Sequence, residues 1–143
     1  MKDLRPNNWF INSEKLDKVR EAWQNDQQDI LPPVLVSRID GILALIDGHS
    51  RAFAAFENGQ NEITADIREL DDIEGSRALY EHIHRQGPGR GIRTITDLAS
   101  RIVTPQKHRL LWINYCTRWL EQHSGSGNVQ LDKTGHLGTK EIL

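Results

Sequence analysis

Residues 43–57 read LALIDGHSRAFAAFE, and this stretch decides the fold. An apolar run ends at Asp47-Gly48, and an alanine-rich pattern typical of a helix begins within two or three residues. The sequence therefore predicts a strand that leads directly into a helix. The first backbone N–H groups of a helix have no partner inside it, so a strand–helix junction of this kind can bind an anion.

A β-hairpin is predicted immediately before this junction. Pro32-Pro33 blocks helix and favours an extended entry into a strand over residues 34–36. Asp40-Gly41 then separates two apolar, β-branched runs, which is a strong signal for a two-residue hairpin turn. The second run, residues 42–46, leads into the junction.

Helices are expected on both sides of this hairpin. Ser13 is the expected N-cap of a helix over residues 14–25, and residues 1–12 before it are expected to be irregular. Leu16, Val19 and Trp23 recur at helical spacing, so they form the apolar face of that helix.

The chain becomes helical after the junction. A helix over residues 50–58 ends at Gly59, a natural left-handed cap, and residues 62–67 are expected to form a third strand. Further helices are expected over residues 76–85, from Thr94 or Thr96 to 102, and from Thr104-Pro105 to about 123.

These elements predict one α+β domain, a small mixed sheet with helices and a helical C-terminal extension. We expect this domain to occupy residues 1–123, with its core at about 4–70 and its extension at about 75–123. Residues 124–143 are rich in Gly and Ser and poor in apolar residues, so they are expected to form a flexible tail.

The composition limits the classes of function. The 143 residues carry a formal net charge of -2, which gives no general attraction to nucleic acid or to anionic membranes. The single cysteine, Cys116, excludes an internal disulfide framework. The N-terminus lacks the apolar core of a signal peptide, and no apolar run has membrane-spanning length. A soluble cytoplasmic protein with no membrane partner is therefore expected.

Five residue types at the junction are suited to phosphate chemistry. Gly48 allows a tight backbone, Ser50 can cap the helix and donate to a phosphate oxygen, and Arg51 offers a planar fork of donors. His49 could bind phosphate as a cation or move a proton, and Asp47 could hold a divalent metal, orient His49 or act as a base. The competing interpretation is a plain turn, with a capping serine and a surface arginine.

The hairpin and junction together resemble the ParB/sulfiredoxin-like domain, also called the ParB N-terminal or ParB-like nuclease domain. In that family a strand that starts at a proline and a second strand lead into a Gly-[Cys/Glu/His]-[His/Arg]-Arg turn that opens a helix. Residues 33–36 read PVLV and residues 45–52 read LIDGHSRA, which supplies this pattern with a DGHxR core. The resemblance covers about residues 4–70, and the helical remainder is similar to small, stand-alone bacterial members.

This resemblance implies a phosphate or nucleotide pocket. Members of the superfamily bind ATP, ADP or CTP with this turn, and the expected cofactor is such a nucleotide with Mg²⁺. Carried over, Gly48, His49, Ser50 and Arg51 would contact phosphate, and Asp47 would lie at the pocket floor or near a metal. The implied partner is a nucleotide or a phosphorylated small molecule, and DNA follows only from the name of the family.

Differences between this chain and the patterns of the family members reduce the number of activities that the resemblance implies. Sulfiredoxins place a catalytic cysteine where this chain has His49, and Cys116 lies in a predicted core helix, so sulfinic acid reduction is not expected. Partitioning ParB proteins carry a Glu-Arg-Arg form of the turn and a helix-turn-helix domain. The free-serine kinases share an Asp-Gly-His-[His/Thr]-Arg turn but use a glutamate shortly after a proline, whereas residues 6–8 hold no acid and Glu14 is the nearest candidate.

Two classes of function remain open. The first is an enzyme for phosphoryl transfer or phosphodiester cleavage, with Asp47 or His49 as the catalytic acid–base group and Arg51 on the transferring phosphate. The second is a non-catalytic module for nucleotide-dependent protein interaction or DNA binding.

Other patterns have mainly structural interpretations. The glycine-rich segment 87–91 is expected to connect two helices, with a second phosphate-facing loop as the alternative. His82 and His84 point to different faces of a helix, so no metal site is predicted. The stripe of Trp112, Tyr115 and Trp119 is expected in the core or at an interface rather than as a base-stacking platform.

Two charged clusters are expected to be solvated. The basic cluster consists of Arg101, Lys107, His108 and Arg109. The alternative to a solvated cluster here is a contact with a phosphate backbone. The acidic cluster consists of Glu69, Asp71, Asp72 and Glu74. The alternative to a solvated cluster here is a site that binds a metal ion.

Overall fold

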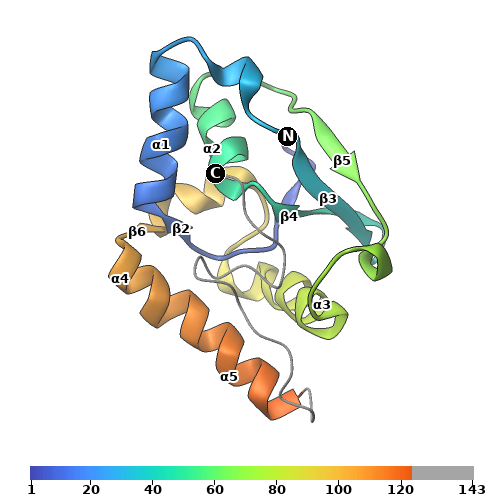
Figure 1. Ribbon diagram of the computed structural model, residues 1–143. Coiled ribbons are helices and arrows are strands. Elements are labelled where there is room, and N and C mark those ends of the chain that lie inside the picture. Colours follow the sequence, from blue (N-terminus) through green and yellow to red (C-terminus); the bar gives the residue numbers. More distant parts are fainter. Residues whose placement is uncertain (124–143) are drawn as a thin grey trace.

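The predicted hairpin forms the centre of a four-stranded mixed sheet with the order β1-β4-β3-β5 (Figure 1). The computed structural model describes residues 1–123. β3 and β4 pair antiparallel, whereas β1 pairs parallel with β4 and β5 pairs parallel with β3. The strands of this sheet are β1 (Arg5–Pro6), β3 (Val34–Ile39), β4 (Ile42–Asp47) and β5 (Ala65–Ile67). The α+β prediction is confirmed.

The hairpin turn has the geometry that its sequence requires. Asp40 and Gly41 have φ of 51° and 78°, so both central residues are left-handed, as a type I′ turn demands. The register sets Ile39 opposite Ile42 and shifts between Leu35 and Val36. Because the turn type fixes the register, the end of β4 is held in position, and β4 carries the junction.

Helices pack beside the sheet and occupy most of the remaining described chain, and the β5 edge is left open. α1 packs against α2, α2 also contacts η4, and α3 contacts α5. The α-helices are α1 (Ser13–Gln24), α2 (His49–Glu57), α3 (Arg77–Gln86), α4 (Pro105–His108) and α5 (Asn114–His123). The short 3₁₀ helices are η1 (Gln28–Ile30), η2 (Leu70–Asp72), η3 (Pro88–Arg90) and η4 (Ile95–Arg101).

The long helix predicted to start at Thr104-Pro105 forms, with an irregularity in its middle. α4 and α5 are joined by a π-helical segment, η5 (Arg109–Ile113), so the three elements follow one another without a break. We call them together the α4–α5 helix. The Thr104 hydroxyl accepts from the Lys107 N–H at 3.2 Å and caps its start, as predicted.

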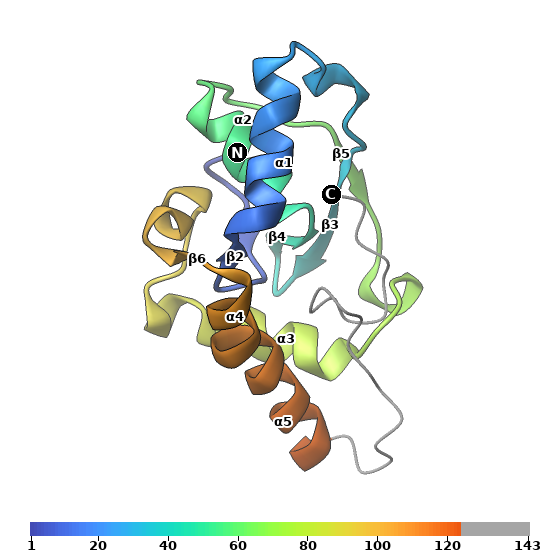
Figure 2. The same ribbon diagram turned by 60° about the vertical axis from the view of Figure 1, so that its left-hand side comes forward.

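A second pair of strands was not predicted. β2 (Ile11–Asn12) and β6 (Ile102–Val103) pair in parallel, and each leads directly into a helix. α1 and the α4–α5 helix therefore begin side by side, as Figures 1 and 2 both show.

Three local predictions need correction. Residues 1–12 contain β1 and β2 and are not wholly irregular. The N-cap of α1 is Asn12 rather than Ser13, because the Asn12 Oδ1 accepts from the Glu14 N–H at 3.0 Å. The third strand is shorter than residues 62–67: only β5 forms, and all three of its residues are exposed.

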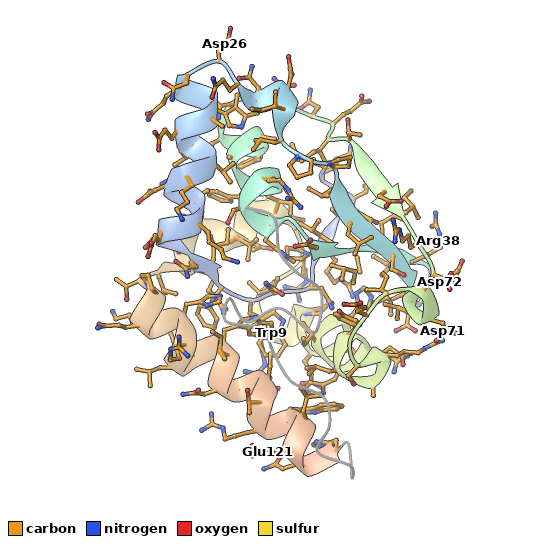
Figure 3. The ribbon with its side chains drawn as sticks, in the orientation of Figure 1. Trp9, Asp26, Arg38, Asp71, Asp72 and Glu121 are labelled. Atoms are coloured by element: carbon orange, nitrogen blue, oxygen red, sulfur yellow. The ribbon has the colours of Figure 1, made fainter. Side chains whose placement is uncertain are left out.

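One hydrophobic cluster joins the sheet to the α4–α5 helix. Leu16 and Val19 of α1 are fully buried within it, as the helical spacing predicted, and Trp23 packs against it. Trp9 stacks at an angle on Trp112, with ring centroids 5.2 Å apart, and Figure 3 shows Trp9 between the sheet and this helix. The helical extension thus shares its core with the sheet.

No helix of the described chain combines the length and the apolar character needed to span a membrane. The flexible tail predicted for residues 124–143 lies outside the described residues.

Candidate functional site

The junction places the start of α2 at the end of β4 with no side chain capping it. Gly48 is the N-cap residue, in the left-handed region with φ of 98°. The intrahelical ladder begins with the Ala52 N–H, which donates to the Gly48 carbonyl at 2.9 Å. The amides of residues 49–51 therefore precede that ladder, at the positive end of a nine-residue helix.

His49 ties this junction to the segment after β1. Its Nε2 accepts from the backbone N–H groups of Asn7 and Asn8, at 3.0 and 3.1 Å, and the residue is 4% exposed. Because both donors are backbone amides, Nε2 carries no proton. His49 thus holds two chain segments together, and its Nε2 is occupied.

Gly48 makes room for the side chain of Arg51. A Cβ on Gly48 would lie 2.6 Å from Arg51 Nη2 and 2.6 Å from Val34 Cγ1. The Arg51 side chain is 3% exposed, and its Nη2 lies 3.8 Å from Asp47 Oδ2. Arg51 therefore folds back over the turn towards Asp47, and the plain-turn interpretation of it as a surface charge is wrong.

A small cavity lies at the start of α2 and is lined by polar residues from three helix starts. It measures about 10 Å³, room for about one water-sized atom, and we call it the Ser50 cavity. His49 and Ser50 line it from α2, Lys15 from α1 and His108 from α4. Its other lining residues are Asn8, Phe10, Ile11 and Asn12.

The strand pair β2–β6 explains why these residues meet. Lys15 is the third residue of α1, and His108 is the fourth residue of α4. Because the two helices start from adjacent parallel strands, Lys15 and His108 reach the same cavity. Each helix start also contributes a partial positive charge.

The electrostatics of the Ser50 cavity favour an anion. Burial, together with the positive charges of Lys15 and Arg109, lowers the pKa of His108 to about 4. His108 is therefore neutral at pH 7, and the positive groups beside it favour this neutral form. Among residues 1–123, no carboxylate lines the cavity.

Arg51 faces a second, larger cavity. This space measures about 470 Å³, and we call it the Arg51 cavity. Trp23, Pro32 and Pro33 line its apolar side, and Gln28 lies beside them. Within residues 1–123, Trp23 Nε1 and Gln28 Oε1 are buried without a hydrogen-bond partner. The structure thus divides the predicted turn residues between two cavities, with His49 and Ser50 on one and Arg51 on the other.

A third cavity, of about 580 Å³, holds no residue of the turn. It is lined by the start of the chain, by Phe56 and by residues 60–62 and 94–96. We therefore place the candidate site at the two cavities that the turn residues line.

The remaining sequence patterns lie elsewhere. His82 pairs with the Tyr115 hydroxyl at 2.7 Å, whereas His84 pairs with Arg5 at 3.2 Å, so the two rings have different partners. Across residues 1–123 no cluster of three or more His, Cys, Asp or Glu side chains could hold a metal ion. Within the segment 87–91, η3 (Pro88–Arg90) forms, and Gly87 alone separates it from α3.

The two charged clusters differ in their exposure. The acidic cluster is exposed, and Figure 3 shows Asp71 and Asp72 at the outer edge of the molecule. In the basic cluster Lys107 and Arg109 are exposed, but His108 is 4% exposed. The prediction of a wholly solvated basic cluster is therefore wrong at His108, because the β2–β6 pair draws that residue into the Ser50 cavity.

Sequence reasoning missed Lys15 and the placement of His108. Neither residue belongs to the turn motif, and only the pairing of β2 with β6 brings them to it. Comparisons with models of known protein families and with curated protein sequences give no match for this chain.

Proposed function

We propose that this chain is a ParB/sulfiredoxin-like domain that binds the phosphate groups of a nucleotide at the start of α2. The observation that carries the proposal is the Ser50 cavity at the start of α2, which Ser50, Lys15 and His108 line and which no carboxylate of residues 1–123 lines. Amides at a helix start and an ammonium group are the usual protein partners of phosphate oxygens.

The size of the cavity suggests how a phosphate would sit. A volume of about 10 Å³ accepts one oxygen atom rather than a whole phosphate group. One oxygen would enter between Ser50 and His108, and the other oxygens would stay at the mouth within reach of Lys15. A phosphate in this position gains from the partial charge of the α2 start.

The Arg51 cavity would take the nucleoside. Its 470 Å³ falls in the usual range for small-molecule sites, and Trp23 and the two prolines give it an apolar wall. Mg²⁺ commonly binds through one or two carboxylates plus the phosphates of a nucleotide, so it would enter with the nucleotide. Asp47, which the sequence offered for such a metal, lines neither of the two cavities and lies 3.8 Å from Arg51 Nη2.

The contacts of the turn favour binding over catalysis by its own side chains. His49 Nε2 already accepts two backbone hydrogen bonds, and Asp47 lies beside the Arg51 guanidinium. Both residues therefore maintain the shape of the turn. A nucleotide-dependent interaction module is favoured by this geometry, and phosphoryl transfer or phosphodiester cleavage would need a proton acceptor from outside the turn.

Isothermal titration calorimetry with ATP, CTP and pyrophosphate, each with and without Mg²⁺, tests the proposal. We expect Lys15→Gln to weaken binding roughly tenfold, as the loss of one charge-assisted hydrogen bond predicts. Lys18→Gln is the matched control, because Lys18 lies on the same helix and is exposed. The absence of binding at concentrations of about a millimolar, or equal losses in the two variants, would refute the site.

A further inference from the structure

We propose that His108 is a direct ligand of the bound phosphate, so that the α4–α5 helix forms one wall of the binding site. This inference rests on the proposed function and extends it. The sequence resemblance covers residues 4–70 only, and the turn motif contains no residue from the helical extension. If His108 binds the phosphate, the helical extension contributes one of the residues that form the site.

The placement of His108 is that of a ligand. The residue is 4% exposed and lines the Ser50 cavity together with Ser50 and Lys15. Among residues 1–123, its ring has no hydrogen-bond partner. The ring nitrogens are not fully buried, so a group that enters the Ser50 cavity can reach them. His49, which lines the same cavity, is instead engaged by two backbone amides.

The backbone around His108 is built to hold it there. The His108 N–H donates to the Thr104 carbonyl at 2.8 Å, in a turn that the Thr104 hydroxyl caps. The π-helical segment η5 begins at the next residue. Such segments add a residue to one turn of a helix and are frequent at functional sites. The side chain is therefore positioned by a capped turn on one side and a π-segment on the other.

The charges that face His108 explain which ligand it lacks. Lys15 faces it from α1 and Arg109 from its own helix, and both are positive, whereas His49 faces it from α2 with an Nε2 that carries no proton. β2 and β6, which also contact α4, contribute no titratable residue. Burial, reinforced by the positive charges of Lys15 and Arg109, keeps the ring neutral in the free protein. A phosphate oxygen would supply the missing negative partner and accept a ring N–H.

Phosphate binding should therefore be coupled to proton uptake. The negative charge of a bound phosphate raises the pKa of His108 from its value of about 4 in the free protein. Because the bound state holds the proton more tightly, affinity rises as the pH falls towards 5.5. The titration of the phosphate itself is common to all variants, so a His108 variant isolates this contribution.

Calorimetric titration of the full chain with pyrophosphate at pH 7.5 and pH 5.5 tests the inference. We expect His108→Gln to weaken binding roughly tenfold at pH 5.5 and less at pH 7.5. Titration in two buffers of different ionisation enthalpy measures proton uptake, which should be smaller in His108→Gln than in the wild type. His123→Gln is the matched control, because His123 is exposed and lies at the far end of the same helix.

The outcomes separate the two proposals. If Lys15→Gln weakens binding but His108→Gln leaves affinity and proton uptake unchanged, the phosphate site stands and the role of His108 is refuted. If the wild type binds no pyrophosphate, both are refuted. Should His108→Gln fail to fold, ¹⁵N NMR of the wild-type ring nitrogens decides the matter: a change on adding pyrophosphate supports the inference, and an unchanged His108 ring overturns it.

Discussion

Substitution of Gly48 by alanine tests the packing of the turn. Alanine would have to adopt φ of 98°, in the left-handed region, which costs about 1–2 kcal/mol for a residue with a Cβ. The new Cβ would also meet Val34 Cγ1 at 2.6 Å. Val34 is a fully buried β-branched residue in β3 and cannot rotate away, and overpacking of this kind costs about 1–3 kcal/mol. We expect a total loss of about 2–5 kcal/mol.

Gly59→Ala is the matched control at the other end of α2. Gly59 has φ of 79°, so it carries the same backbone cost, but a Cβ there would have no neighbour within 4 Å. Urea unfolding followed by far-ultraviolet circular dichroism gives the free energy of unfolding for both variants. Gly48→Ala should lose about 1–3 kcal/mol more than Gly59→Ala. Equal losses would show that Gly48 does not make room for Arg51 and Val34.

Three further predictions concern stability and reactivity. Asn12→Ala should reduce the free energy of unfolding by about 1 kcal/mol and Ser13→Ala by much less, because Asn12 caps α1; chemical denaturation distinguishes them, and the reverse order would contradict the cap. Burial holds the pKa of His108 at about 4 against an ordinary 6.5, so the unfolded chain takes up its proton first as the pH falls. The free energy of unfolding should therefore have its full value above about pH 6.5 and decline towards pH 4. The decline should be up to about 3 kcal/mol larger than in His108→Gln, and parallel pH profiles of the two proteins would refute this. Burial also raises the pKa of the Cys116 thiol, so a disulfide reagent should label it only as fast as the protein unfolds, and rapid labelling of the native protein would show that the thiol is accessible.

The parts of the fold that depend on local chemistry could be predicted from the sequence. Asp40-Gly41 specifies its turn through two left-handed residues, and Thr104-Pro105 starts a helix because its hydroxyl caps the first turn. The signal for the junction at Asp47-Gly48 is also local, since an apolar run is followed by alanines within a few residues. In each case the residues that determine the structure are neighbours in the chain.

The missed features depend on contacts between distant segments. β2 and β6 have two residues each, too few for any periodicity to be detected, and their pairing joins segments far apart in the sequence. That pairing brings Lys15 and His108 to the turn. The position of the Arg51 side chain next to Gly48 likewise depends on β3, because Val34 of β3 also packs against Gly48. The motif thus lies at the candidate site but contains only part of its lining.

Amide chemical shifts of ¹⁵N-labelled protein, followed during titration with pyrophosphate, test the central claim most directly. The account predicts that the largest shifts occur at residues 49–51, whose amides precede the α2 hydrogen-bond ladder, with smaller shifts around Lys15 and His108. Shifts confined to other parts of the chain, or no shifts at about a millimolar pyrophosphate, would contradict the claim that the start of α2 binds phosphate.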